Sequence, residues 1–400
     1  MPLQDLLPEL LVSLLGSAEC LSDLRAIAST SKRIYSVFED EKAALIYRVL
    51  SNELGPVLSD ALALSKTESL DASSPSYHQQ VRNAVSMYAG YLSGQKSPSP
   101  RRLPLDYVLS LVNCYRIMKY LADVYIKSKL MLFQNEINPR SSSSPSLMAS
   151  PSRTERLRVL RAFYRLQIIF NLYGNAESSS RREYNELDTE CINYHLFGLW
   201  EPWELQQVSC VAAITQRLYV QFARIEDYFL RKEGTSRRVY FGLTALRNFI
   251  EKLRASHNAI WQTTLRETSN LEIATRVRGM FVNYKMEWFH CRHHEYRMKT
   301  FPHGKYSYPT LIHFDGDCVT SAPFAWVDAF DGQYALDFFA SAASNGRADS
   351  QLMQLGIPMG LAWSRLGFVI WDAPRVTTLK RSSVLTEFAT GWALGHTTGL

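Results

Sequence analysis

The chain has 400 residues, enough for two or three domains of ordinary size. Hydrophobic residues make up 46% and charged residues 20%, which is the balance of a globular protein with a substantial core. A net charge of +6 is small for this length, so the composition gives no reason to expect nucleic acid as a partner.

The cysteines and the N-terminus indicate the cellular compartment. Six cysteines are scattered without paired spacing, which predicts reduced thiols and no disulfide framework. The apolar N-terminal segment carries Asp5 and Glu9 but no Lys or Arg, unlike a secretory signal. No apolar run approaches the roughly 18 residues of a membrane span. We therefore expect a cytoplasmic or nuclear protein that does not enter a membrane.

The first fifty or so residues predict three short helices. Leucines recur at helical spacing in residues 3–15, with Pro8 and Glu9 where a first turn favours them. Ser22 and Asp23 offer capping oxygens for a second helix. A third is expected to begin after residues 29–31 and to run to Leu50.

Further helices are expected along the rest of the chain. After a break at Gly55-Pro56, apolar spacing predicts helical segments, with two Ser/Pro-rich stretches near 94–104 and 138–153 as mobile loops. The helical segments are 58–64, 105–133, 154–173, 203–232, 240–256, 270–296, 325–343 and 360–371. From residue 300 onward prolines and glycines shorten the elements. No alternating strand pattern or internal repeat is present, so the predicted fold class is all-α.

The predicted domain organisation has three parts. Residues 1–50 form a three-helix module, 51–299 a larger helical body with the two mobile loops, and 300–400 a region of short helices packed on that body.

Residues 6–38 resemble the F-box motif. Leu6-Leu7-Pro8-Glu9-Leu10-Leu11 matches its opening, and Leu14-Leu15, Asp23-Leu24, Ile27, Ser31, Tyr35 and Phe38 follow in order. Leu7 stands where the motif has its first proline, and Ala18 where it usually has a leucine. The resemblance implies that an apolar helical face binds the Skp-type adaptor of a cullin-type ubiquitin ligase. By resemblance, this face is formed by Leu6, Pro8, Leu10, Leu11, Leu14, Leu15 and Leu24.

Three further segments resemble a large, poorly characterised group of F-box-like proteins of filamentous fungi. They are residues 36–64, the helix start Pro202-Trp203-Glu204 and the late sequence Leu366-Gly367-Phe368-Val369-Ile370-Trp371-Asp372. This resemblance implies a substrate-recognition subunit of an SCF-type ligase, recruiting an unknown protein substrate, with no chemistry and no cofactor of its own.

Two alternatives stay open from the residues themselves. The same leucines can be core, because a leucine stripe at helical spacing usually packs inward; the chain would then be a non-enzymatic helical scaffold. A ligand-binding protein or enzyme with a tryptophan-lined pocket is the third reading. No phosphate-binding glycine loop, nucleophile elbow or dinucleotide fingerprint supports it, so we expect no enzyme.

Other residue clusters have plain structural explanations. His290, Cys291, His293 and His294 are weak metal candidates because zinc needs further ligands, so no metal is predicted. The arginines of the helix at 153–165 are expected to form a solvated basic face. The tryptophans Trp200, Trp203, Trp288, Trp326 and Trp371 are expected to be core anchors. The Ser-Pro serines Ser97, Ser99, Ser144 and Ser150 suit proline-directed kinases.

Overall fold

The computed structural model describes residues 6–71, 74–96, 103–137, 149–173, 196–201, 243–256 and 370–381, and single positions between 203 and 218, at 312 and at 367. All regular structure in these residues is helical, which confirms the all-α prediction. The chain divides into two compact units, Met1–Met118 and Lys119–Leu400. The boundary falls within the long helix α7 (Leu105–Ile137).

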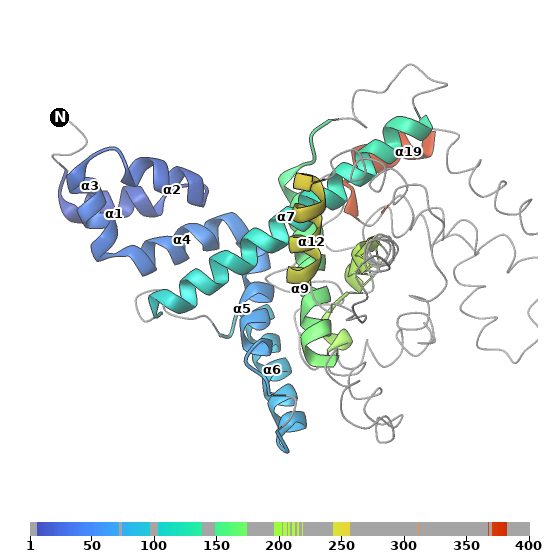
Figure 1. Cartoon of the computed structure of the whole chain (residues 1–400), viewed down its shortest axis with the longest axis horizontal. Helices are drawn as coiled ribbons and strands as arrows, with labels where there is room; N and C mark the ends of the chain where they lie inside the picture. Colours follow the sequence, from blue (N-terminus) through green and yellow to red (C-terminus); the bar gives the residue numbers. More distant parts are fainter. Residues whose placement is uncertain are drawn as a thin grey trace, which may run out of the picture. The chain divides into compact units, whose positions relative to one another are not determined.

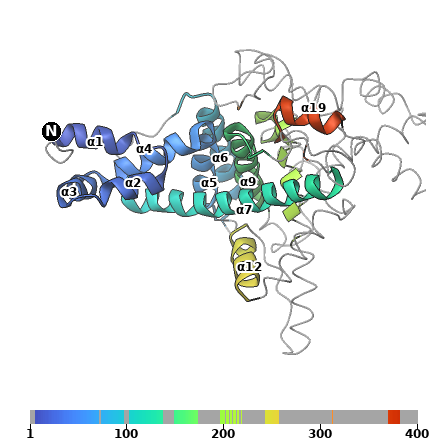
Figure 2. The same cartoon turned by 90° about the horizontal axis from the view of Figure 1, so that it is seen from above.

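The first unit begins with four helices that pack against one another (Figures 1 and 2). They are α1 (Pro8–Gly16), α2 (Leu21–Ala28), α3 (Lys32–Asp40) and α4 (Lys42–Leu54). Pro8 and Glu9 occupy the first turn of α1, as expected. The Ser31 hydroxyl accepts a hydrogen bond from Ile34 N at 3.2 Å, so a serine caps α3. The start of α2 differs from expectation, because Ser22 and Asp23 lie inside its first turn and provide no cap.

The expected third helix is two helices that meet at Glu41. Four consecutive charged residues, 39–42, interrupt the apolar spacing here, but no Gly or Pro marks a helix end. Lys42 lies beside it, donating hydrogen bonds to Glu39 at 2.9 and 3.2 Å and lying over the Phe38 ring. The hydrogen bond from Lys42 lowers the pKa of Glu39 below its ordinary value. Separate helices let Ile34 of α3 and Leu45 of α4 both reach the core of the unit.

Two helices follow and pack against each other (Figure 1). α4 ends where Gly55 takes a positive φ of 51° and Pro56 follows, within the 3₁₀ turn η2 (Gly55–Val57). α5 (Leu58–Thr67) was expected, whereas α6 (Tyr77–Leu92) was not predicted. The buried Asp60 of α5 accepts a hydrogen bond from the Tyr88 hydroxyl of α6, which fixes the pairing of the two helices.

The second unit contains the C-terminal part of α7 together with α9 (Arg153–Tyr173), α12 (Leu243–Ser256) and α19 (Ala373–Arg381). The first three were predicted within a few residues of their observed ends. Aromatic side chains join α7 to the rest of this unit, since Tyr125 meets Phe163 edge-on at 6.4 Å and Phe133 meets Trp371 at 5.6 Å between ring centroids. α12 begins where Gln167 of α9 accepts a hydrogen bond from Leu243 N at 2.8 Å.

Several predictions lie outside the described residues. They are the helices expected at 270–296 and 325–343, most of the helices expected at 203–232 and 360–371, and the loop segments 97–102 and 138–148. Of the second loop, residues 149–152 are described and are hydrogen-bonded to α9 and to residues 372–375. The helix at the end of the described chain, α19, begins just beyond the segment for which helical spacing was noted.

Candidate functional site

The first unit exposes apolar side chains at the start of α1. Leu7 is 64% exposed and Leu10 is 52% exposed, with Pro8 exposed between them and Leu6 and Leu14 half-buried on either side. We call these five residues the α1 apolar patch. Tyr35 of α3, a helix that packs against α1, is 52% exposed as well. Exposed apolar side chains gathered in this way are typical of a surface that a partner covers.

The seven residues of the predicted adaptor-binding face separate into two groups. Leu11, Leu15 and Leu24 are fully buried and form the core between α1, α2 and the helices behind them. Leu6, Pro8, Leu10 and Leu14 lie at the surface or half-buried. The resemblance to the F-box places both groups on one adaptor-binding face, and it does not tell which of these leucines pack into the unit's own core. Leu7, which was not in the predicted set, is the most exposed of the large apolar residues that the structure describes.

Hydrogen bonds from α3 and α4 fix the position of α1. Arg33 Nη2 donates to Leu6 O at 3.0 Å, and Asn52 Nδ2 donates to Gly16 O at 3.2 Å, so both ends of the helix are held. Glu53 of α4 accepts from Leu21 N at 3.3 Å and thereby caps α2, and it also accepts a hydrogen bond from the Tyr115 hydroxyl. The patch therefore lies on a helix whose orientation is set by its own unit, a requirement for a preformed docking surface.

The arginines of α9 occupy a different environment from the one predicted. Arg158, Arg161 and Arg165 are buried, so the expectation of a solvated basic face is wrong for them. Arg161 and Arg165 each lie 3.2 Å from an oxygen of Glu204, and Arg165 also lies 4.9 Å from the centre of the Trp200 ring. We call the three arginines the α9 arginine cluster. Arg156, which precedes the cluster on the same helix, is exposed.

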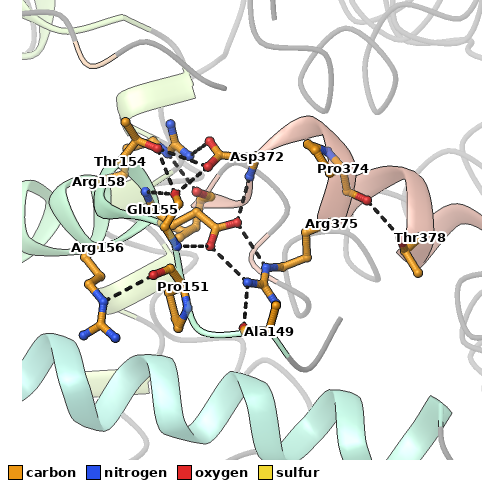
Figure 3. Close-up of polar contacts among 12 residues, drawn as sticks. Ala149, Pro151, Thr154, Glu155, Arg156, Arg158, Asp372, Pro374, Arg375 and Thr378 are labelled. Carbon is orange, nitrogen blue, oxygen red and sulfur yellow. Dashed lines mark hydrogen bonds and ion pairs between the residues drawn. The ribbon is translucent and has the colours of Figure 1, made fainter. Parts of the chain in front are cut away.

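Arg158 connects α9 to the segment before α19 (Figure 3). Its Nε donates to Ile370 O at 2.8 Å, and its Nη2 pairs with the carboxylate of Asp372. The other oxygen of Asp372 accepts hydrogen bonds from the hydroxyls of Ser152 at 2.5 Å and Thr154 at 3.1 Å. Buried charges persist in proteins when they are paired and hydrogen-bonded in this way.

A second buried pair joins the start of α9 to α19 (Figure 3). Arg375 donates to both oxygens of Glu155, at 3.0 and 3.2 Å, and to Ala149 O at 3.0 Å. Glu155 also completes a capping box, since it accepts from Ser152 N at 3.0 Å while the Ser152 hydroxyl accepts from Glu155 N at 3.0 Å. The carboxylate thus serves the helix start and the contact with α19 together.

Of the three segments that resemble the fungal group, the two later ones, 202–204 and 366–372, both contact the α9 arginine cluster. Glu204 of the first segment pairs with Arg161 and Arg165, and it accepts from Glu201 N at 3.0 Å at the start of its own helix. Asp372 of the second segment pairs with Arg158. These residues organise the core of the second unit, and their chemistry there is structural.

The tryptophan predictions are confirmed where the structure describes them. Trp200, Trp203 and Trp371 are buried, and the Arg375 guanidinium lies 5.2 Å from the centre of the Trp371 ring. Trp288 and Trp326 lie outside the described residues, so a pocket built with them is not tested.

The weak metal candidates His290, Cys291, His293 and His294 also lie outside the described residues. Within the part of the chain that is described, no group of three or more His, Cys, Asp or Glu side chains could hold a metal ion. In the same part, no helix combines the length and the apolar character needed to cross a bilayer.

Comparison with protein-family models, with curated proteins and with solved structures finds no match to this chain.

Proposed function

We propose that the chain is a substrate-recognition subunit of a cullin-type ubiquitin ligase that binds a Skp-type adaptor through the α1 apolar patch. The observation that carries this proposal is the exposure of Leu7 and Leu10, 64% and 52%, on the helix whose sequence resembles the start of an F-box. In this role the chain supplies binding surfaces only. The ligase partners carry out the chemistry, and the rest of the chain recruits a protein substrate.

The geometry of α1 suits such a role. Leu11 and Leu15 bury one side of the helix in the unit's own core, and this leaves Leu7, Pro8 and Leu10 for a partner. Complete burial of a leucine side chain contributes about 1.5–3 kcal/mol. Scaled by their exposed fractions, Leu7 and Leu10 together can contribute about 2–3 kcal/mol to binding.

The sequence resemblance and the exposed surface are independent reasons for the same assignment. The resemblance rests on the order of residues 6–38, whereas the exposure depends on how the unit packs. The scaffold alternative explains the buried Leu11, Leu15 and Leu24 equally well, but it gives no role to exposed leucines on a helix that is held at both ends.

The test is capture by a purified Skp-type adaptor, comparing the wild type with Leu7→Asp/Leu10→Asp. Leu7 is the N-cap residue of α1 and Leu10 lies in its first turn. Aspartate is favourable at both places, so the change removes the apolar surface without weakening the helix. We expect the affinity to fall by about 100-fold or more, from the lost burial and the added charge.

A matched control is Leu105→Asp/Leu109→Asp on α7 in the same unit. These leucines are 37% and 43% exposed, so the control adds the same charges at other apolar surface residues. It should retain capture. Failure of the wild type to bind the adaptor, or equal loss in both double variants, would contradict the proposal and leave the scaffold function in its place.

A further inference from the structure

We propose that Ser150 is a phosphorylation site for a proline-directed serine/threonine kinase, and that its phosphate pairs with Arg156 at the start of α9. This inference does not depend on the proposed ligase function. Ser150 is exposed and directly precedes Pro151, the minimal recognition element of such kinases. A residue before proline is restricted to extended backbone, the form in which a substrate segment lies along a binding cleft.

The backbone around Ser150 is held in place from both sides (Figure 3). Arg375 Nη2 donates to Ala149 O at 3.0 Å, and Arg156 Nε donates to Pro151 O at 3.4 Å. Two residues later, Ser152 enters the capping box of α9 and its hydroxyl bonds to Asp372. Ser150 is thus presented at a defined position beside two guanidinium groups.

Ser150 differs in its surroundings from Ser74, which also precedes a proline. Ser74 is half-buried. Its hydroxyl is hydrogen-bonded to Ser76 Oγ at 2.9 Å and accepts from Ser76 N at 3.2 Å. Ser97, Ser99 and Ser144 lie outside the described residues. Of the two described serines that precede a proline, Ser150 is the exposed one, and arginines donate hydrogen bonds to the carbonyls on either side of it.

Arg156 is the cation that suits a phosphate at this place. Its guanidinium already contacts the carbonyl next to Ser150, and its side chain is 51% exposed. Its other contact is with the exposed Asp123 at 3.6 Å, a type of pair that stabilises little. A phosphoserine carries a charge of about −2 and accepts strong hydrogen bonds from arginine, so it competes well for this group. The nearby acids Glu155 and Asp372 are buried and already paired with arginines.

The modification is a simple transfer. The Ser150 Oγ forms a bond to the γ-phosphorus of ATP, the bond from that phosphorus to the bridging β–γ oxygen breaks, ADP leaves, and the hydroxyl proton passes to the kinase's base. The phosphorylated chain then carries a dianion next to the junction of α9 and α19, where Arg156 holds it.

The test uses the full chain with Ser74, Ser97, Ser99 and Ser144 replaced by alanine, a proline-directed kinase and magnesium-ATP. We expect this variant to incorporate phosphate at Ser150, shown by peptide mapping, and to lose incorporation when Ser150→Ala or Pro151→Ala is added. Incorporation no greater than in the Ser150→Ala version would overturn the site. Phosphorylation of a free peptide of residues 145–156 but not of the folded chain would overturn it too.

The role of Arg156 has its own readout. A ³¹P titration of the phosphorylated chain should give a lower second pKa for the phosphate than the phosphorylated peptide gives, because the guanidinium favours the dianion. In Arg156→Gln we expect phosphorylation to be retained and this lowering to be lost. Equal phosphate pKa values in chain and peptide would refute the pairing.

Discussion

Replacement of Arg158 by methionine tests whether the α9 arginine cluster holds the second unit together. Arg158 is buried, and it donates to Ile370 O at 2.8 Å and pairs with Asp372. Methionine fills much of the same volume but leaves a buried carboxylate without its cation and a carbonyl without its donor. Breaking a buried pair from one side costs about 3–5 kcal/mol. Asp372 keeps the hydroxyls of Ser152 and Thr154, so we expect about 3 kcal/mol, roughly a 100-fold change in the unfolding equilibrium.

The assay is urea unfolding followed by far-ultraviolet circular dichroism, with the midpoint compared at unchanged slope. Arg156→Met is the matched control on the same helix, because Arg156 is exposed and lies 3.6 Å from an equally exposed Asp123. It should change the free energy of unfolding by less than about 1 kcal/mol. If Arg158→Met is no more destabilising than Arg156→Met, the buried arginine cluster does not stabilise the contact between α9 and the segment before α19.

A double variant separates the lost attraction from the stranded charge. Arg158→Met/Asp372→Asn removes both charges while the amide oxygen still accepts from Ser152. We expect it to be more stable than Arg158→Met alone, because the uncompensated carboxylate is gone. Additive effects of the two changes would show that the residues are not energetically coupled.

Two further outcomes follow from close packing and burial. Gly367 has a φ of 70°, and a Cβ there would lie 2.5 Å from the hydroxyl of the buried Tyr125. Gly367→Ala should therefore destabilise the second unit by about 1–3 kcal/mol in a thermal melt, and adding Tyr125→Phe should recover part of the loss; no recovery would mean that the Tyr125 hydroxyl is not the obstacle. Burial raises the pKa of Tyr47 to about 12 from its ordinary value of 10.0. The contribution of the neutral Tyr47 hydroxyl to the free energy of unfolding is fully present below pH 10 and is lost as the pH rises toward 12. Urea titrations of Tyr47→Phe should therefore show a smaller fall of this free energy between pH 10 and 12. The same fall in wild type and variant would refute this.

Helices with clear ends and apolar spacing could be predicted from the sequence. Pro8, Ser31 and Gly55 mark boundaries through their own backbone chemistry, and the structure has helix ends at all three. The break at Glu41 was not predicted, because the charged residues 39–42, which do interrupt the apolar spacing, include no Gly or Pro that would end a helix. The start of α2 was misjudged for a similar reason, since its capping group is Glu53, which lies 32 residues away.

Apolar residues on all sides of α9 indicate that its arginines are buried, although helical spacing alone predicts an exposed basic face. Leu157, Leu160 and Tyr164 lie at helical spacing on one side of α9. Val159, Ala162 and Phe163 are apolar as well and lie on its other sides, so little of the helix is left for solvent. The partners of the arginines could not be found from spacing. Glu204 lies 43 residues from Arg161, and Asp372 lies 214 residues from Arg158. Only the fold brings these groups together.

The candidate site was predictable as a helix but not as a surface. The leucine spacing located α1, yet it could not tell that Leu11 and Leu15 face the core while Leu7 and Leu10 face outward. That division depends on α3 and α4, which hold α1 through Arg33 and Asn52.

Amide hydrogen exchange of the full chain, with and without a saturating Skp-type adaptor, tests adaptor binding by the α1 apolar patch most directly. The proposal predicts slower exchange in α1 when the adaptor is present, no such change in Leu7→Asp/Leu10→Asp, and unchanged exchange in α9. Exchange in α1 that is the same with and without the adaptor would contradict the proposed function.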